Sequence, residues 1–252
     1  MADGRRAGDR LAARDGYLMR STSAENPGPG PGTGATRVAP TVAHPVLLVR
    51  HAATSWTGRR WSGRADPILS TDGRRAARRL GPEVSAALHE LGALDESGDR
   101  PGTVALLVSP ARRARQTAAS IETALGVAAT VEPDLVEIDV GVAEGLDWPT
   151  LEMRHPDLAQ DIARGVQPDW PGGETRADVE RRAARVAGRI RAAAARHPVV
   201  VVSHGGIIHS VASLLVEDGG PLPALEPAEI LRLEPAAAPD RRPCRPRGRP
   251  EG

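Results

Sequence analysis

Two histidines and several arginines in this sequence follow short apolar segments, and side chains of these types suit chemistry on a phosphoryl group. Arginine forks bind phosphate oxygen atoms bidentately. A neutral imidazole can attack phosphorus as a nucleophile, and a carboxyl group can supply a proton to the leaving oxygen atom. The residues that carry this pattern are Arg50, His51, Ser109, Arg112, Arg113, Arg115, Glu137, Ser203 and His204.

Each of these features also has a simpler interpretation. A single histidine at the end of a strand is more often structural than catalytic, but His51 and His204 follow two apolar segments in the same way, which favours a site. The arginines of residues 112–115 could be a solvated helix start. Because the helix macrodipole disfavours positive charge at that end, the run also indicates an anionic partner.

The elements that must position these side chains begin with five candidate strands. Residues 46–49, 104–108 and 199–202 are short, continuous apolar runs rich in valine and leucine. Such runs are typical of strands buried on both faces of a parallel sheet. Weaker strand patterns occur at residues 130–132 and 229–234.

Helical patterns lie between these strands. The clearest begins at Thr175, where apolar residues recur at helical spacing and where Thr175 and Asp178 have the spacing of a capping box. Ser70 is a candidate N-cap, and the helix after it contains Gly81-Pro82, which predicts a break or kink. The predicted helices span residues 70–92, 112–125, 175–196 and 205–216.

Alternating strands and helices predict an α/β fold, a three-layer α/β/α sandwich with a mostly parallel central sheet. In open sheets of this kind, sites form at the carboxyl ends of the strands. We therefore expect the histidines and arginines that follow the three strong strands to meet at one edge of the sheet.

The ends of the chain differ from its middle. Residues 1–45 contain a Gly/Pro-rich stretch and carry a charge of +2, which predicts a disordered N-terminal extension. Residues 235–252 carry a charge of +3 and predict a disordered Pro/Arg-rich tail. Residues 46–234, the expected folded domain, carry a charge of −4.

Composition excludes several functions. The sequence has no lysine, so all 33 basic residues are arginine, and lysine chemistry such as a Schiff base or a P-loop lysine is excluded. Cys244 is the single cysteine and cannot form an internal disulfide. No apolar run approaches the roughly 20 residues of a membrane span. With no recognisable signal segment, we expect a cytoplasmic protein.

Six segments, in order, resemble the motifs of the histidine phosphatase superfamily, in its phosphoglycerate-mutase-like branch. The first contains Arg50-His51, where the family has Arg-His-Gly, and the last contains Ser203-His204-Gly205-Gly206, which is similar to the second histidine motif. Each segment is a weak signal alone, but the ordered set is specific. The segments are residues 49–54, 63–70, 109–118, 135–145, 171–175 and 203–206.

The resemblance implies a role for five residues. His51 would be the nucleophile that becomes phosphohistidine, and Glu137 would be the general acid. Arg50, Arg113 and His204 would hold the phosphoryl oxygen atoms. It also implies that no metal and no other cofactor is required, because the arginines and the second histidine would supply the positive charge.

The resemblance leaves the substrate open. Ala52 replaces the glycine of the signature, which would be unfavourable if the backbone needed a positive φ there. Thr57 stands where many members have an asparagine. All four tryptophans lie near motifs, which predicts an apolar rim that could stack a sugar or a base. The expected substrate-binding residues are Trp56, Thr57, Trp61, Arg64 and Gly205.

The preferred function is a metal-independent phosphomonoesterase that acts through a phosphohistidine on a small phosphorylated metabolite. Phosphoglycerate mutase-type transfer is the first alternative. The absence of lysine and the short connection of 67 positions between Glu137 and His204 disfavour it. A non-catalytic phosphate-binding module is a second alternative, although it would not need all five residues. The negative charge of the middle segment argues against nucleic acid as a partner. The oligomeric state stays open.

Overall fold

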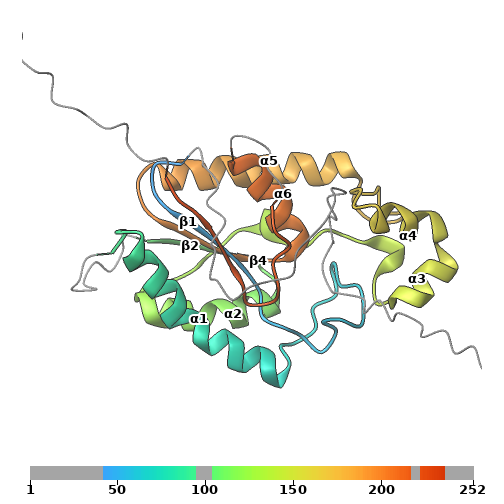
Figure 1. The fold of residues 1–252 in the computed structure, drawn as a ribbon, viewed down its shortest axis with the longest axis horizontal. Helices are drawn as coiled ribbons and strands as arrows, with labels where there is room; N and C mark the ends of the chain where they lie inside the picture. The colour runs from blue at the N-terminus through green and yellow to red at the C-terminus, as the bar shows by residue number, and fades with distance from the viewer. Residues whose placement is uncertain (1–41, 95–103, 217–221, 236–252) are drawn as a thin grey trace, which may run out of the picture.

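The computed structural model describes residues 42–94, 104–216 and 222–235 (Figure 1). The predicted extension up to residue 41 and the predicted tail from residue 236, with Cys244, lie outside the described residues. Val42 lies four residues before the expected start of the domain, yet its side chain is buried in the core.

Within the described residues, five strands form one sheet in the order β3-β2-β4-β1-β5. β4 pairs in parallel with both β1 and β2, and β2 pairs in parallel with β3, whereas β5 is antiparallel to β1. The predicted α/β class with a mostly parallel sheet is therefore confirmed. The strands are β1 (Val46–Arg50), β2 (Ala105–Val108), β3 (Thr130–Val131), β4 (Val199–Ser203) and β5 (Ile230–Leu233).

Helices cover both faces of this sheet. α1 and α2 lie on one face and α5 and α6 on the other, while α3 and α4 lie beyond the sheet (Figure 1). The short helices α3 and α4 had no counterpart in the sequence expectations. The helices are α1 (Thr71–Glu90), α2 (Arg112–Leu125), α3 (Trp148–Arg154), α4 (Pro156–Ala163), α5 (Arg176–Ala194) and α6 (Gly205–Leu215).

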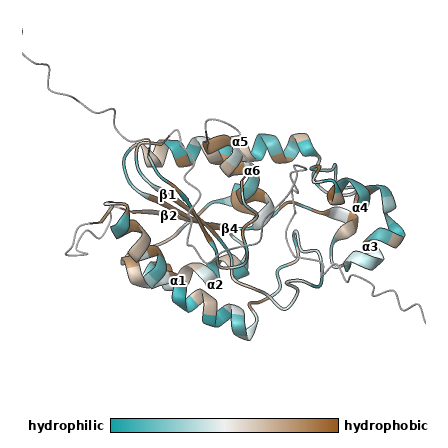
Figure 2. Cartoon of the chain, in the orientation of Figure 1, coloured by the Kyte–Doolittle hydropathy of each residue, from teal (hydrophilic) through white to brown (hydrophobic). Residues whose placement is uncertain are grey.

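The central strands are apolar on both faces because each face packs against helices. Side chains alternate along a strand, so Val46 and Leu48 of β1 contact the α5 and α6 side. Leu47 and Val49 pack with α1 and α2. The strands are accordingly the most hydrophobic part of the chain in Figure 2. This two-sided burial explains why β1 and β4 are continuous apolar runs rather than alternating ones.

The helix starts follow their sequence signals. The Ser70 hydroxyl accepts the backbone N–H of Gly73 and caps α1. At α5 the Thr175 hydroxyl accepts the N–H of Asp178, and the Asp178 carboxylate accepts the N–H of Thr175. The predicted capping box is therefore confirmed, with aspartate in the place of the usual glutamate.

Of the predicted break or kink at Gly81-Pro82, the break is wrong, because α1 continues through Pro82. Gly81 serves helix packing instead. A Cβ atom at Gly81 would lie 2.4 Å from the carbonyl oxygen of Ser120 in α2. The missing side chain lets the two helices approach closely, and buried contacts of Leu80 and Val84 on the same helix hold α1 against the sheet.

A separate apolar cluster lies outside the sheet. It joins α3 and α4 to the loop segments around Ile138 and Trp170. The ring of Trp61 lies 5.6 Å from that of Trp170 and 6.4 Å from that of Trp148, measured between centroids. Three of the four tryptophans thus gather in this cluster, while the sheet itself is aliphatic.

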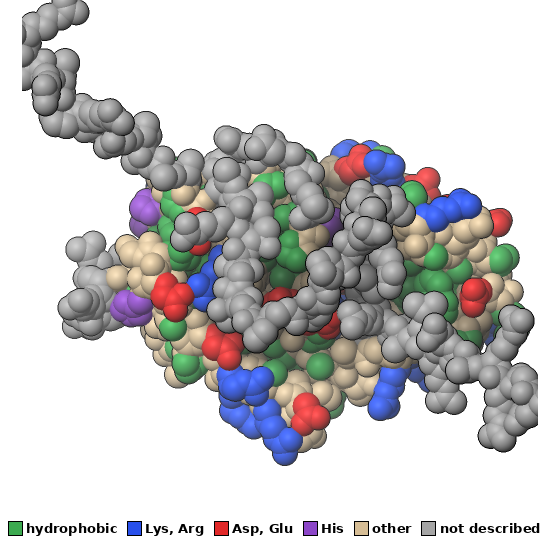
Figure 3. Space-filling view, viewed as in Figure 1, with side chains coloured by type: hydrophobic (Ala, Val, Ile, Leu, Met, Phe, Trp, Pro, Cys, Tyr) green, Lys and Arg blue, Asp and Glu red, His purple; other side chains and the backbone are tan. Residues whose placement is uncertain are grey.

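Arginine and acidic side chains lie side by side around the edge of the face shown in Figure 3. Ion pairs near the surface include Arg176 with Glu180 and Arg185 with Asp134. The part of the chain that the structure describes contains no helix long and apolar enough to span a membrane.

Candidate active site

The two histidines meet because β1 and β4 are neighbours in the sheet. Arg50 at the end of β1 pairs in register with Ser203 at the end of β4, so the next residues, His51 and His204, leave the same edge together. The His51 backbone N–H donates to the Ser203 carbonyl oxygen at 2.8 Å. The centroids of the two imidazole rings lie 5.0 Å apart, and both side chains are buried.

His51 lines the pocket as a neutral ring whose Nε2 atom carries a lone pair rather than a proton. Its Nδ1 atom lies 2.9 Å from the carbonyl oxygen of Ala52, which can only accept, so Nδ1 carries the proton. Burial and the positive charge of Arg113 lower the pKa of His51 from 6.5 to about 3, although the bond to Ala52 opposes this shift. A neutral imidazole with a free Nε2 lone pair is the form that can act as a nucleophile.

Ala52 fits its place in spite of the departure from the glycine signature. Among the described residues other than glycine, only Ala228 has a positive φ, so the backbone of Ala52 needs no glycine. Its N–H donates to the Thr117 hydroxyl of α2 at 3.0 Å, and its side chain is fully buried.

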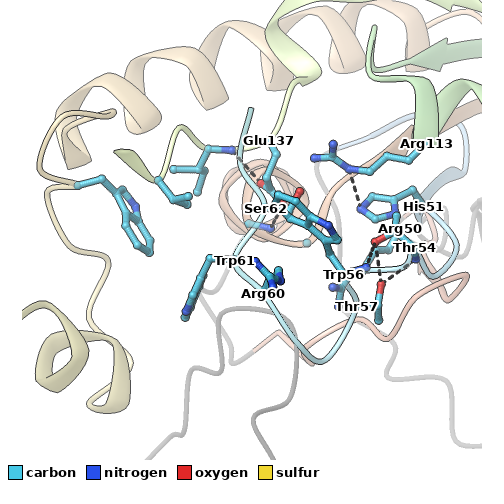
Figure 4. Close-up of a pocket in the computed structure, with 15 residues that line it drawn as sticks. Arg50, His51, Thr54, Trp56, Thr57, Arg60, Trp61, Ser62, Arg113 and Glu137 are labelled. Carbon is cyan, nitrogen blue, oxygen red and sulfur yellow. Dashed lines mark hydrogen bonds between the residues drawn. The ribbon is translucent and has the colours of Figure 1, made fainter. Parts of the chain in front are cut away.

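Arg113 lies between the two imidazoles. Its Nε–H points at Nε2 of His51 (3.3 Å) and at Nδ1 of His204 (3.2 Å). Its two terminal nitrogen atoms donate to the carbonyl oxygens of Ala65 (2.6 Å) and Gly63 (3.1 Å). The neighbouring Arg112 has an exposed side chain. Arg113 is thus the arginine of the run that reaches the histidines (Figure 4).

The anionic partner of the arginine run is a carboxylate of the chain itself. Asp66 accepts the backbone N–H of Arg112 at 2.6 Å and that of Arg113 at 3.3 Å, and it also pairs with the Arg113 guanidinium. These contacts cap the start of α2, where the N-cap residue Ala111 offers no side-chain hydrogen bond.

His204 is tied to the end of β2. Its Nε2 atom lies 2.8 Å from the hydroxyl oxygen of Ser109, and both residues are fully buried. Burial, followed by the charges of Arg113 and other cationic neighbours, lowers the pKa of His204 well below 6.5. This shift favours a neutral ring, in agreement with the hydrogen bond that Nδ1 of His204 accepts from Arg113.

Glu137 lies against the N-terminus of α6. Its carboxylate accepts the backbone N–H groups of Ile138 (2.9 Å), Ile207 (3.1 Å) and Gly206 (3.3 Å). A Cβ atom at Gly206 would lie 2.9 Å from the Glu137 carboxylate, so this glycine makes the approach possible. Glu137 also lines the pocket, on the far side of the Trp56 ring from Arg113 in Figure 4.

A buried ion pair fixes the segment that carries Glu137. Arg182 of α5 forms two hydrogen bonds with the Glu174 carboxylate, at 2.8 and 2.7 Å. The same guanidinium donates to the carbonyl oxygens of Asp134 and Val136. The sequence placed Glu174 in a family-like motif but carried no signal for Arg182, which lies in an arginine-rich helix.

Arg50 lines the pocket and contacts the segment that leads to β5. Its side chain is buried, and one terminal nitrogen donates to the carbonyl oxygen of Leu225 at 2.6 Å. Gly205 also lines the pocket, and a Cβ atom there would lie 3.4 Å from Nε of Arg50.

Aromatic and aliphatic side chains line one part of the pocket, here called the outer pocket. Trp56, Trp61 and Trp170 line it together with Ile138 and Val140. The sequence expectation of an apolar rim had included all four tryptophans, but Trp148 is not among the residues that line the pocket and packs behind Trp61. Figure 4 shows Trp56 in the middle of the view, between Trp61 and His51.

Of two further residues expected to bind substrate, one lines the pocket and the other does not. Thr57 lines the pocket, and its hydroxyl accepts the backbone N–H of Thr54 at 2.8 Å. Arg64 is not among the lining residues and instead approaches Asp139 and Glu174, with nitrogen to oxygen distances of 3.6 Å in both cases. Sequence reasoning missed Arg60, which does line the outer pocket.

These features lie at one edge of the sheet of a three-layer α/β fold, and the family follows from comparison. A model of branch 1 of the histidine phosphatase superfamily matches residues 46–235. The chain belongs to this superfamily. Proteins named as phosphatases are among those that are similar to this chain.

The individual relatives share about a quarter to a third of their residues with this chain. The chain is 34% identical over 209 residues to bifunctional protein Rv2228c of Mycobacterium tuberculosis. The aligned region covers 82% of this chain and 53% of that protein. It therefore spans about half the length of that relative. It is 29% identical over 187 residues to the uncharacterized phosphatase PhoE of Bacillus subtilis, covering 74% and 83% of the two chains. The structure of a mycobacterial glucosyl-3-phosphoglycerate phosphatase with VO3 aligns with a TM-score of 0.59 at 26% identity, covering 75% and 92%.

Proposed function

We propose that this protein is a metal-independent phosphomonoesterase that acts through a phosphohistidine on a small phosphorylated metabolite. The observation that carries the proposal is the pair of neutral imidazoles, His51 and His204, which both accept from the single Nε–H of Arg113. A phosphoryl group that enters the pocket can take over this N–H and leave Nε2 of His51 free to attack.

The first half of the reaction transfers the phosphoryl group to His51. The Nε2 lone pair forms the N–P bond while the P–O bond to the leaving group breaks. The carboxyl group of Glu137 gives a proton to the leaving oxygen atom, so that an alcohol departs. Arg50 and Arg113 balance the charge that develops on the phosphoryl oxygens.

The second half returns the site to its starting state. A water molecule adds to phosphorus and loses a proton to the Glu137 carboxylate. The N–P bond breaks, its electron pair returns to Nε2 of His51, and phosphate leaves. The same carboxyl group thus acts first as an acid and then as a base.

Trapping the intermediate tests this assignment. Rapid quenching of the wild-type protein with a substrate labelled on phosphorus should yield an acid-labile phosphoprotein. His51→Ala should form none and should lose turnover. A fully active His51→Ala protein would refute the assignment of the nucleophile.

Independence from metal ions is a separate prediction. Two buried arginines supply positive charge where the phosphoryl oxygens would lie, which is the task that a metal ion performs in other phosphatases. Hydrolysis of an aryl phosphate should therefore persist in a chelator. Activity that disappears with the chelator and returns with a divalent ion would contradict this part of the proposal.

The outer pocket favours a leaving group with a flat apolar face. Trp61 is packed between Trp148 and Trp170, which holds its ring in place. The guanidinium of Arg60 lies 6.0 Å from the centroid of the Trp56 ring and adds a positive charge to the same wall. An aromatic or nucleoside-like leaving group can stack there, and stacking of this kind contributes about 1 kcal/mol beyond area burial.

A panel of phosphomonoesters tests the substrate class and separates hydrolysis from mutase-type transfer. Phosphate release should be faster from aryl phosphates and nucleoside monophosphates than from sugar phosphates and phosphoglycerate. Trp61→Leu should reduce this preference, while Trp148→Leu, which removes an indole outside the pocket, should change it less. Phosphoglycerate isomerisation, assayed in parallel, should be slower than phosphate release, and the reverse result would favour the mutase.

A further inference from the structure

The hydrogen bond between Ser109 and His204 has no part in the reaction described above. It is short, with 2.8 Å between the hydroxyl oxygen and Nε2, and neither side chain is accessible to solvent. Ser109 directly follows β2, and the backbone N–H of Ala111 donates to its hydroxyl oxygen at 3.3 Å. This second contact holds the serine in place.

The position of the proton on His204 follows from its neighbours. Arg113 can only donate, so Nδ1 of His204 must present a lone pair to the Arg113 Nε–H, 3.2 Å away. The proton of the neutral ring then lies on Nε2 and is donated to the Ser109 hydroxyl oxygen.

This arrangement cannot persist when a phosphoryl group binds. The Arg113 Nε–H would turn to a phosphoryl oxygen, and Nδ1 of His204 would then oppose an oxygen atom that also carries lone pairs. Two acceptors in contact repel each other. A proton on Nδ1 removes this conflict and turns His204 into a charged donor.

The charges around His204 oppose a proton on its ring until an anion binds. The groups that act on it are Arg113 from α2, Arg50 and His51 at the end of β1, and Arg182 from α5. Glu137, next to the start of α6, is the carboxylate of the same pocket. Burial, followed by these cationic neighbours, keeps the ring neutral, and a dianion bound between Arg50 and Arg113 opposes the effect of the cations.

We propose that His204 takes up one proton at Nδ1 when a phosphoryl dianion binds, and that Ser109 is the positioning residue that accepts Nε2–H in both states. The proton comes from the solvent and returns to it when phosphate leaves. The inference rests on the proposed function only in that the anion is placed between Arg50, Arg113 and the histidines.

The proposal predicts a specific effect on the pH profile. Because a hydrogen bond to the charged form raises a pKa, removal of the Ser109 hydroxyl lowers the pKa of His204 in the complex. For Ser109→Ala, the alkaline limb of kcat, which reports groups of the enzyme–substrate complex, should move to lower pH. At neutral pH, kcat/KM should fall about tenfold or more, as expected for a hydrogen bond to a charged group.

The direct test uses sulfate, a dianion that does not titrate near neutral pH. Calorimetric titration in buffers of different ionisation enthalpy counts the protons that the protein takes up on binding sulfate. The same titration of His51→Gln excludes the other imidazole as the group that binds the proton. Nitrogen NMR of labelled histidine in the wild-type protein should show Nε2–H alone without sulfate and both N–H groups of His204 with it. Binding without proton uptake would overturn the inference and leave the phosphatase proposal intact.

Two variants separate positioning from packing. Ser109→Thr keeps the hydroxyl and should restore the wild-type alkaline limb. Ser203→Ala removes another buried hydroxyl, one that donates to the Leu135 carbonyl oxygen at 2.6 Å, and should leave the limb where it is. An equal shift in Ser109→Ala and Ser203→Ala would contradict the role of Ser109. Failure of the wild-type protein to bind sulfate would contradict both this inference and the proposed phosphoryl site.

Discussion

The nitrogen atoms of the Arg113 guanidinium have two different kinds of partner, backbone carbonyl oxygens and the two histidines. Two of them bind the carbonyl oxygens of Ala65 and Gly63, while Nε points at both histidines. A lysine has a single ammonium group and could not serve both purposes. The absence of lysine from the chain is therefore compatible with a site whose donors to the histidines and backbone come from a planar arginine side chain.

Glu137→Gln tests the acid at the scale of one residue. The glutamine oxygen can keep the hydrogen bonds from Ile138 and Ile207, so the fold around it should be retained. Hydrolysis should slow by about 10²- to 10⁴-fold for substrates with poor leaving groups and much less for good ones. The measurement is kcat/KM over a series of aryl and alkyl phosphates. Equal slowing for all of them would argue against a general acid.

At the scale of elements, the start of α6 joins the second histidine to the acid. His204 is the N-cap residue of this helix, and the first N–H groups of the helix bind Glu137. Orphan N–H groups at a helix N-terminus need acceptors, and here one carboxylate supplies them. The two catalytic candidates are therefore coupled through backbone rather than through a direct side-chain contact.

Gly206→Ala tests this coupling. A Cβ atom would lie 2.8 Å from Ile138 and 2.9 Å from the Glu137 carboxylate, so one of them must move. We expect activity to fall by about 10²-fold, because small displacements of a catalytic group have effects of this size. Gly188→Ala is the matched control, since nothing lies within 4 Å of that position in α5. Equal kinetics in both variants would show that the approach of Glu137 does not depend on this glycine.

At the scale of the whole molecule, the buried neutral histidines link stability to pH. Burial and Arg113 lower the pKa of His51 from 6.5 to about 3, and burial likewise lowers the pKa values of His204 and His209. Below pH 6.5 the unfolded chain binds protons that the folded protein does not. The free energy of unfolding should therefore fall as the pH drops from 6.5 towards 3, by about 1.4 kcal/mol per pH unit for His51, with His204 and His209 acting in the same direction.

Urea denaturation over this pH range measures the effect. His51→Gln and His204→Gln should each make the dependence shallower between pH 6.5 and the onset of carboxylate titration. Above pH 6.5 the contribution is constant, because neither state binds the proton there. An unchanged slope in both variants would contradict the assignment of neutral buried rings.

Removal of the two ends should not affect the fold. Deletion of residues 1–41 and 236–252 is expected to leave the melting temperature and the activity unchanged. Deletion through residue 43 should cost about 2 kcal/mol, because it removes Val42, which is buried in the core with Ala194 and Val199. Thermal denaturation of the two shortened chains makes the comparison. A loss of folding in the shorter deletion would show that the ends pack against the domain.

Local patterning predicted most of the elements. Continuous apolar runs predicted β1, β2 and β4 because two-sided burial leaves no polar positions. The capping pair of Thr175 and Asp178 marked the start of α5. The short helices α3 and α4 were not predicted, because they have few residues over which a period can repeat. The role of Gly81 was not predicted either, because it depends on α2, which lies far away in sequence.

By itself, the sequence determined the fold class, the residue types of the site and the edge of the sheet at which they meet. These depend on local periodicity and on the order of motifs along the chain. Only the tertiary structure decided that β1 lies next to β4, that Asp66 is the anion at the start of α2, and that Arg60 rather than Arg64 lines the pocket. It also decided that both imidazoles are neutral, because burial and charges brought together from distant segments control protonation.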